Sequence, residues 1–400
     1  MNSRPPYRPR LAVVLSHPTQ YYSPWFRWMA ATAPFDLRVF YLWNFGVAPQ
    51  RDPLFGARFA WDVDLLTGYE HEFVPNRARE PGTETFGGLD NPDLPARLRA
   101  WHPDAALVFG YRFRTHLRLI RWARRQRLPL IFRGDSHLLG HSRPSWTKRL
   151  VLRWIYRHFA AVTYVGAANR DYFRAFGVPD ARLHFAPHAV NHVHFDPTTH
   201  RHRDRALALR HELGLAPATR VVLFAGKFLP AKQPRALLTA FARLRPPDTA
   251  LVFVGDGEER AALERDAAAS GAAVHFLPFA NQSEMPSRYL LADLFVLPSR
   301  GLYETWGLAV NEAMQMGVPC LVSDLVGCQR DLVTDGRTGW VFCAQNPDTL
   351  QAKLAEARQA LAQPAARDEI RRAVAERISG YTYAHATTGL LAALRTAADK

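Results

Sequence analysis

The sequence predicts an α/β protein of two consecutive domains, each built around a parallel β-sheet. Three observations lead to this prediction. The chain has 400 residues, more than a single hydrophobic core ordinarily organises. Short apolar or β-branched runs alternate with helical patterns, which is typical of βαβ units. The alternation stops at a polar stretch rich in His and Arg, about residues 191–205, and then begins again.

In the first half, the predicted strands are short apolar runs bounded by polar residues or glycine. They cover residues 11–16, 36–43, 104–110, 128–134 and 161–166. The predicted helices are LPARLRAW, 117–127, 144–159 and 167–177. Residues 44–95 are rich in Gly, Pro and aromatic residues, and they predict no regular element.

The second half repeats the alternation. Its predicted strands cover 220–226, 249–257, 272–279, 293–299 and 319–324. Its predicted helices are 234–244, GEERAALERDAAA, 285–292 and 308–317. Ligands of parallel sheets bind outside the carboxyl ends of the strands, so we expect the functional residues in the loops that follow these strands.

The composition is that of a globular protein, with 48% hydrophobic and 22% charged residues. The three cysteines, Cys320, Cys328 and Cys343, are an odd number without metal-ligand spacing, which argues against a disulfide framework or a zinc site and favours a reducing cytoplasm. The apolar run 11–15 is too short for a signal peptide, and no stretch approaches the roughly 20 apolar residues that span a bilayer. We therefore expect a soluble or peripheral protein.

The net charge of +15 is concentrated in one region. Residues 107–157 contain 13 basic residues and one acid, Asp135. Within them, SWTKRLVLRWIYRHF (145–159) places Trp146, Leu150 and Trp154 on one helical face with basic residues interleaved. This pattern predicts contact with an anionic membrane surface. The alternative is a core-packing helix with an arginine-rich solvent face.

The loop after the first strand of the second half contains two of the chain's five lysines. The segment GKFLPAK places Lys227 and Lys232 around a strand exit that begins with Gly226. Two ammonium groups in such a loop suit the charges of a diphosphate. A solvated loop is the alternative, although this arginine-rich chain would more readily have used Arg there.

Two glutamates flank the start of a later helix. Glu304 lies in the loop after a strand, and Glu312 lies eight residues further on, inside the helix. Because a helix N-terminus binds anions, the amides between them predict a phosphate site. The residues predicted to begin this helix are Thr305, Trp306, Gly307 and Leu308. Alternatively, Glu304 complements the helix dipole and Glu312 is a surface residue, but Glu312 lies among apolar residues and a half-buried carboxylate needs a partner.

Together these motifs resemble those of family 4 (group 1) retaining glycosyltransferases of the GT-B fold. The similarity rests on E-x7-E followed by G-x-P, on G-[R/K]-x4-K, and on the segments VFVGDGEER, FLPFANQSEMPSRYLLADLFVLPS and APHAVNHVHF. It covers about residues 186–340. The chain departs from the pattern at Pro278, where glycine is usual, and at His188 and Asn191. In the first half, HPTQYYSPWF replaces the usual glycine pair.

The resemblance implies two Rossmann-like domains facing each other across a cleft. We expect an acceptor-side domain over residues 1–198, completed by a C-terminal helix at 382–400. The nucleotide-sugar-binding domain is expected over 199–381.

The resemblance also implies roles for individual residues. Lys227 and Lys232 bind the donor diphosphate beside Gly226, and Glu304 holds the 3- and 4-hydroxyls of the sugar. Glu312 bonds the ribose, and Phe279 lies near the base. The remaining donor-binding positions are Thr305, Trp306, Gly307 and Leu308, whose amides meet a phosphate.

On the first-domain side, His137 matches the cleft histidine of the family and would reach the sugar from the opposite side. Glu304, His137 and Lys232 are thus the expected catalytic residues. A lone His is often structural, and this chain has 16 of them. Asp135, in the same RGDSH segment, would orient the ring of His137 or cap a helix.

The implied function is transfer of a sugar, with retention of configuration, from a UDP- or GDP-sugar to an acceptor. A sugar or lipid-linked acceptor is expected, as in the synthesis of cell-envelope polysaccharide or glycolipid. The resemblance implies no metal and no further cofactor, which agrees with the absence of a D-x-D carboxylate pair at a strand exit. The expected location is the cytoplasm, peripherally at the inner face of the cell membrane.

Two other classes of function compete with this interpretation. A non-catalytic nucleic-acid binder would explain the sequence pI of about 10.2, but no nucleic-acid-binding motif is present and the charge is confined to one region. A nucleotide-sugar epimerase or phosphorylase would share the two-domain plan, but epimerases lack the E-x7-E segment. Release of nucleoside diphosphate that depends on an acceptor would distinguish transfer from epimerisation.

Overall fold

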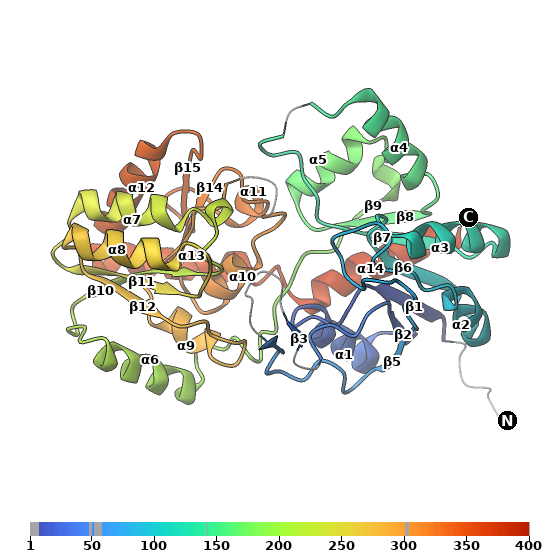
Figure 1. The fold of residues 1–400 in the computed structure, drawn as a ribbon, viewed down its shortest axis with the longest axis horizontal. Helices are drawn as coiled ribbons and strands as arrows, with labels where there is room; N and C mark the ends of the chain where they lie inside the picture. The colour runs from blue at the N-terminus through green and yellow to red at the C-terminus, as the bar shows by residue number, and fades with distance from the viewer. Residues whose placement is uncertain (1–7, 48–49, 52–57, 142, 301–303, 400) are drawn as a thin grey trace.

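Two parallel sheets, side by side, organise the computed structural model, which describes residues 8–47, 50–51, 58–141, 143–300 and 304–399 (Figure 1). The first sheet has the order β5-β2-β1-β6-β7-β8-β9, and the second has the order β12-β11-β10-β13-β14-β15. Each pairing within them is parallel. The sequence prediction of two parallel α/β sheets is confirmed.

The first sheet is built from seven strands. They are β1 (Arg10–Leu15), β2 (Asp36–Tyr41), β5 (Glu70–Phe73), β6 (Ala105–Phe109), β7 (Leu130–Arg133), β8 (Ala161–Tyr164) and β9 (Leu183–Phe185). The helices between them are α1 (Tyr22–Thr32), α2 (Leu94–Trp101), α3 (Arg114–Gln126), α4 (Trp146–Tyr156) and α5 (Ala167–Ala175). A small antiparallel pair, β3 (Gln50–Arg51) and β4 (Arg58–Phe59), lies outside this sheet.

The second sheet has six strands. They are β10 (Arg220–Ala225), β11 (Thr249–Val254), β12 (Val274–Leu277), β13 (Leu294–Leu297), β14 (Cys320–Ser323) and β15 (Gly339–Phe342). The helices of this half are α6 (His200–Glu212), α7 (Pro234–Leu244), α8 (Arg260–Ser270), α9 (Met285–Leu290), α10 (Leu308–Gln315), α11 (Gln329–Leu332), α12 (Pro347–Ala362) and α13 (Pro364–Ile378). A last helix, α14, covers Tyr383–Ala398.

The strand order of each sheet indicates where a ligand crevice lies. In the first sheet β1 lies between β2 and β6, and in the second β10 lies between β11 and β13. At such a switch point the connections leave in opposite directions, which opens a crevice outside the carboxyl ends of the strands. The loops after β1, β10 and β13 therefore stand at the two switch points.

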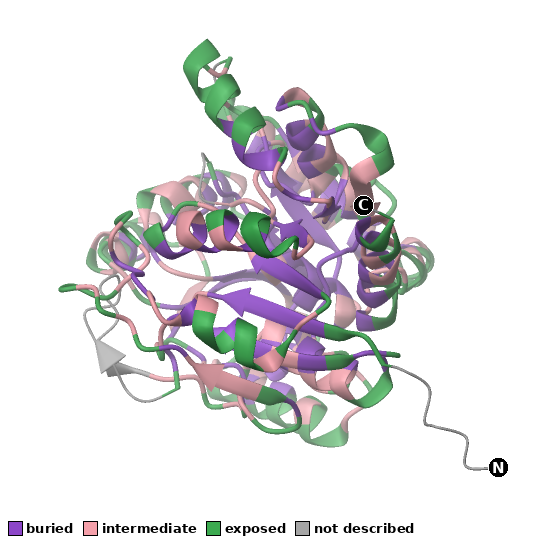
Figure 2. Cartoon of the chain, turned by 90° about the vertical axis from the view of Figure 1, so that its right-hand side faces the viewer, coloured by how far each residue is buried: buried purple, intermediate pink, exposed green. Residues whose placement is uncertain are grey.

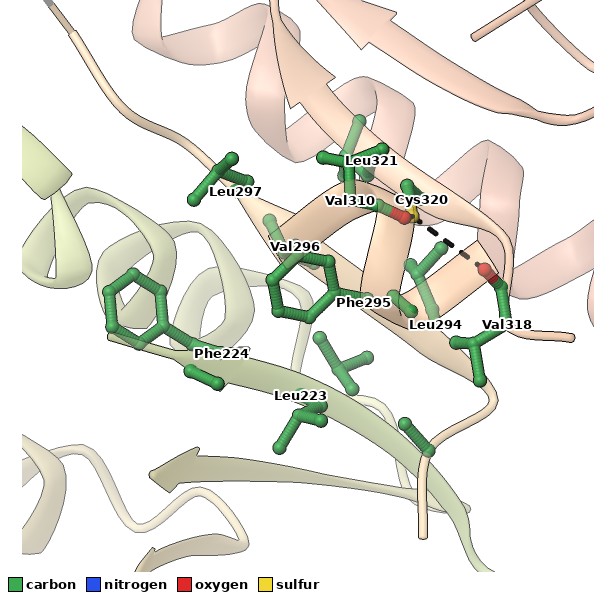
Figure 3. Packing of buried hydrophobic residues seen from close by; sticks show 14 of the residues in the cluster. Leu223, Phe224, Leu294, Phe295, Val296, Leu297, Val310, Val318, Cys320 and Leu321 are labelled. Atoms are coloured by element: carbon green, nitrogen blue, oxygen red, sulfur yellow. Dashed lines mark hydrogen bonds between the residues drawn. The ribbon is translucent and has the colours of Figure 1, made fainter. Parts of the chain in front are cut away.

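Hydrophobic burial holds each sheet between its helices. Figure 2 shows the central strands of the first sheet buried, and exposed residues on the helices around them. In the second sheet, Phe224 of β10 and Phe295 of β13 belong to a buried cluster that also includes Val310 of α10 (Figure 3). Because α10 packs here through its apolar face, its position relative to β13 is fixed, and so is its N-terminus.

The end of the chain returns to the first sheet. Helix α14 packs against β7, β8 and β9, and the hydroxyl of Thr387 accepts a hydrogen bond of 2.9 Å from the Trp25 indole. At Gly389 the helix and strand backbones approach so closely that an added Cβ would lie 1.8 Å from the carbonyl oxygen of Phe185. This packing holds the C-terminal helix α14 against the first sheet.

Some elements differ from the sequence prediction. Strand β5 has the polar sequence EHEF and lies at the edge of the sheet, where half-buried side chains give no apolar run. Helix α6 begins at His200, inside the polar stretch 191–205. Only Ala206 and Leu209 of this helix are buried, so its sequence shows no continuous apolar face. Its polar composition reflects a solvent-facing helix and not an extended connection.

We predict that Gly389→Ala destabilises the first domain. The new methyl group would clash with the backbone of β9, and overpacking of this kind costs about 1–3 kcal/mol or more. Thermal unfolding followed by circular dichroism should show a lower melting temperature than that of the wild type. Gly380→Ala is the matched control, because the nearest neighbouring atom, the carbonyl oxygen of Arg377, would be 3.9 Å from the new Cβ. Equal melting temperatures for the two variants would contradict the close approach of α14 to β9.

Candidate active site

A cavity of about 470 Å³ lies between the carboxyl ends of the two sheets. Both halves of the chain line it. Ten of the residues predicted as donor-binding lie on its wall: Gly226, Lys227, Lys232, Phe279, Glu304, Thr305, Trp306, Gly307, Leu308 and Glu312. The structure therefore brings together residues that the sequence spreads over more than 80 positions.

Glu304 and Lys232 form an ion pair inside this cavity. The same carboxylate oxygen of Glu304 accepts a hydrogen bond of 2.8 Å from the hydroxyl of Ser299. Both side chains of the ion pair are largely shielded from solvent, and shielding strengthens their attraction. Lys227 also lines the cavity, on the loop after β10.

The N-terminus of α10 opens onto the cavity. The helix begins at Leu308, as the predicted range 308–317 has it, and not at Thr305, because Gly307 has a left-handed backbone (φ 96°). No side chain caps this end and no acidic residue stands in its first turn, so its positive end is available to an anion. Thr305 and Trp306 precede the helix, and Trp306 is buried with its indole donating to Asn311 at 2.7 Å.

Glu312 is buried, with 3% of its surface exposed, so the alternative that it is a surface residue is wrong. Its two carboxylate oxygens accept hydrogen bonds from Gln282 at 3.0 Å and from the Tyr289 hydroxyl at 2.7 Å. Burial raises the pKa of Glu312, while hydrogen bonds from Gln282, Tyr289 and Tyr21 oppose that rise. The carboxylate is thus held in one orientation, with Tyr21 reaching it from the first half of the chain.

His137 is placed differently from the other predicted residues. It is buried, with 4% exposure, and it does not belong to the cavity wall. Its Nδ1 accepts from the amide of Leu139 at 3.1 Å, and its Nε2 lies 3.2 Å from the carbonyl oxygen of Glu304. Because Nδ1 accepts, Nε2 carries the proton and donates it to that carbonyl. His137 therefore contacts the Glu304 backbone across the two domains.

Asp135 has a different environment from the one predicted. Its carboxylate lines the cavity and accepts a hydrogen bond of 2.9 Å from the hydroxyl of Thr305. His188, not His137, is the imidazole beside it, with Nε2 at 3.5 Å. The side chain thus neither orients His137 nor caps a helix, and both predicted roles for it are wrong.

Sequence reasoning assigned no role to several first-domain residues of the cavity wall. They are His17, Thr19, Gln20, Tyr21, Phe45 and Trp61. The first four lie in HPTQYYSP, directly after β1, and their position at a switch point is the signal that could have identified them. Phe45 and Trp61 lie in the stretch 44–95, where no periodic pattern offers such a signal.

A short segment of that stretch fastens the first domain to the second. The side chain of Asn281 donates to the carbonyl of Ala60 at 2.9 Å, and the amide of Ser283 donates to the carboxylate of Asp62 at 3.1 Å. Trp61 lies between these two contacts and faces the cavity that Gln282 also lines. The wall around Glu312 is therefore assembled from both domains.

Helix α4 has two distinct faces. Leu152, Ile155 and Tyr156 are buried in the first domain. On the outer face Trp146 is 73% and Trp154 43% exposed. The further exposed apolar residues are Leu150 and Val151, and the exposed basic ones are Lys148, Arg149, Arg153 and Arg157. The helix thus packs on the core and also presents an outer surface of Trp, Leu and basic residues.

Two kinds of feature are absent from the described residues. None of the helices there is long and apolar enough to cross a membrane. Within the same part of the chain, no group of three or more His, Cys, Asp and Glu side chains is arranged to hold a metal ion.

Comparison with known proteins agrees with this geometry. The family model described as glycosyl transferases group 1 matches residues 207–377. A D-inositol 3-phosphate glycosyltransferase of Nocardia farcinica is 31% identical over 346 residues, which cover 76% of this chain and 72% of that protein. A GDP-mannose-dependent alpha-(1-6)-phosphatidylinositol monomannoside mannosyltransferase of Mycolicibacterium smegmatis is 32% identical over 227 residues, 54% of this chain and 58% of that one.

Solved structures show the same fold. HepE of Anabaena, in complex with UDP and glucose, aligns with a TM-score of 0.70 at 16% identity, covering 97% of this chain and all of HepE. WaaG, a glycosyltransferase involved in lipopolysaccharide biosynthesis, aligns with a TM-score of 0.62 at 17% identity, covering 96% of this chain and 99% of WaaG. At these identities the likeness concerns the fold alone. Together with the sequence relatives, it places this chain in group 1 of the glycosyl transferases, the retaining enzymes of the GT-B fold.

Proposed function

We propose that this retaining glycosyltransferase binds a UDP- or GDP-sugar in the cavity and transfers the sugar to a sugar or lipid-linked acceptor. The observation that carries the proposal is the convergence of the ten predicted donor-binding residues on one cavity. Relatives named as glycosyltransferases of inositol phosphate and of phosphatidylinositol mannoside support a phosphorylated or lipid-linked acceptor.

The diphosphate would lie between α10 and the loop after β10, which carries Lys227 and Lys232. Lys227 and Lys232 supply positive charge, and the amides at Gly307 and Leu308 supply hydrogen-bond donors at the positive end of a helix. A bound diphosphate would compete with Glu304 for the ammonium group of Lys232. This competition would release the Glu304 carboxylate to accept hydrogen bonds from the sugar hydroxyls.

The nucleoside would occupy the other end of the cavity. Glu312 already accepts hydrogen bonds from Gln282 and Tyr289, and its remaining lone pairs can accept ribose hydroxyls. Phe279, which is partly exposed on the same wall, would contact the base. Because Glu312 is fixed by its partners, the ribose would meet a carboxylate that needs no reorganisation.

Transfer would proceed on the face from which the diphosphate departs. The bond between the anomeric carbon and the diphosphate breaks, and its electron pair goes to the leaving oxygen. The acceptor hydroxyl oxygen forms the new bond, and its proton passes to that leaving oxygen. Lys227 and Lys232 would stabilise the departing charge, so the proposal requires no metal. His137 would act by holding the carbonyl of Glu304 and thereby the loop that carries it.

We also propose that α4 binds the anionic inner face of the cell membrane, which would place the enzyme in the cytoplasm as a peripheral protein. Trp146 and Trp154 suit the headgroup region, and the basic residues between them suit anionic lipid. The only acid in residues 107–157, Asp135, lies in the cavity and leaves this surface basic. An enzyme held in this way would meet a lipid-linked acceptor at the membrane.

We predict that Lys232→Ala and Glu304→Ala each lower kcat by about 100-fold or more, because each removes a charge that acts on the leaving group or the sugar. Release of nucleoside diphosphate in the presence of acceptor measures the effect. Lys353→Ala is the control, because Lys353 forms ion pairs with Asp335 and Glu356 outside the cavity. Near-normal activity in both cavity variants would refute the proposed function.

Glu312→Gln should weaken nucleoside diphosphate binding. The neutral amide replaces a charged acceptor whose hydrogen bonds contribute about 1.5–3 kcal/mol, so the Kd should rise roughly 10- to 100-fold. Isothermal titration with UDP and GDP measures this change. Glu264→Gln on α8, which alters an exposed ion pair with Arg260, should leave the Kd unchanged. An unchanged Kd for Glu312→Gln would show that the ribose does not bind there.

The paired substitution Trp146→Ser and Trp154→Ser should reduce binding to vesicles that contain phosphatidylglycerol, because two interfacial anchors are lost. Cosedimentation measures the bound fraction, and Leu207→Ser on α6, also at an exposed apolar residue, is the control. Binding of the wild type should weaken as salt rises and should be absent on neutral phosphatidylcholine. Equal binding by the wild type and the tryptophan variant would refute the role of α4.

A further inference from the structure

Asp135 places a carboxylate of the first domain in the donor cavity, opposite the segment that carries Glu304. It follows β7 after Gly134, and 37% of its side chain is exposed. Its Oδ2 accepts the hydroxyl hydrogen of Thr305, the residue next to Glu304. His188 approaches the same oxygen at 3.5 Å. These two contacts fix the direction of the carboxylate.

The electrostatic surroundings keep this carboxylate charged. Burial alone would raise the pKa of Asp135, but the contacts with His188 and Thr305 outweigh it, and the pKa lies below its ordinary value. The nearby guanidinium of Arg133 donates instead to the carbonyl of Ala186 at 3.0 Å and stacks over Trp25. Asp135 is therefore a fixed negative charge that faces the cavity.

A negative charge at this place needs an explanation, because the same cavity carries the cationic groups expected to bind a diphosphate. A carboxylate repels phosphate, so it does not serve the diphosphate end. Retaining transfer instead develops positive charge on the anomeric carbon and the ring oxygen of the sugar. A preorganised carboxylate close to that centre stabilises the transition state more than the ground state.

We propose that Asp135 contacts the transferred sugar from the first-domain side and stabilises the positive charge that develops on it. This inference rests on the proposed function. In the step, the bond from the anomeric carbon to the diphosphate oxygen breaks and its electron pair goes to that oxygen. The acceptor oxygen forms the new bond and its proton passes to the leaving oxygen. Asp135 forms no covalent bond and keeps its charge throughout.

The competing explanation is a purely structural contact between the domains, through the hydrogen bond from Thr305. The chain offers a matched control for this explanation. Asp331 also joins the domains by its carboxylate, which accepts from the amide of Ala167 at 3.0 Å, and it does not line the cavity. Asp331→Asn therefore makes the same chemical change at the same interface, away from the proposed chemistry.

The test compares Asp135→Asn, Asp135→Glu and Asp331→Asn in two measurements. The first is kcat for the release of nucleoside diphosphate in the presence of acceptor, and the second is the Kd for UDP and GDP. The proposal expects Asp135→Asn to lower kcat by about 100-fold, with a Kd within about threefold of the wild type. It expects Asp135→Glu to recover part of the rate and Asp331→Asn to stay within about threefold. A kcat near that of the wild type in Asp135→Asn would overturn the proposal, as would equal losses in Asp135→Asn and Asp331→Asn. A wild type that binds neither nucleotide would instead refute the proposed function.

Discussion

The segment from Glu304 to Asn311 is held by both domains at once, and the arrangement of the cavity depends on this constraint. The carbonyl of Glu304 accepts hydrogen bonds from His137 and from the amide of Gly327, both at 3.2 Å. The hydroxyl of Thr305 donates to Asp135. The side chain of Asn311 accepts from the Trp306 indole and donates to the carbonyl of His188 at 3.2 Å. The residues proposed to bind sugar, phosphate and ribose are thus held in place relative to the first domain.

The charges in this cavity are costly to bury and are therefore oriented by partners. Lys232 neutralises Glu304, and Ser299 directs the same carboxylate. Glu312 lies deeper and is stabilised by hydrogen bonds alone, which leaves its pKa raised by burial. A donor that brings two negative phosphoryl groups and many hydroxyls would find both signs of charge already in place. Electrostatic preorganisation of this kind is a main source of enzymatic rate enhancement.

The sequence was most informative where the functional residues lie close to a strand exit in the second half. Lys232 and Glu304 each follow a predicted strand and Glu312 lies inside a predicted helix, so local pattern together with the family resemblance predicted that all three bind one donor. The cavity residues of the first domain were harder to predict, because they reach the cavity only through the tertiary packing of the two domains. His137 and Asp135 are two residues apart on one loop, and only the fold decides that the acid faces the cavity while the imidazole faces the Glu304 carbonyl. Trp61 lies in a segment without periodicity, whose place is set by Asn281 and Ser283 of the other domain.

The most direct test of the proposed donor-binding site is a crystal structure of the protein with UDP or GDP. It should show phosphate oxygens within hydrogen-bond distance of the Lys232 ammonium and the Leu308 amide, and the ribose hydroxyls on the carboxylate of Glu312. The same structure should show the Lys232–Glu304 ion pair loosened. A nucleotide bound outside this cavity, or one that leaves Glu312 and the N-terminus of α10 without contact, would contradict the account.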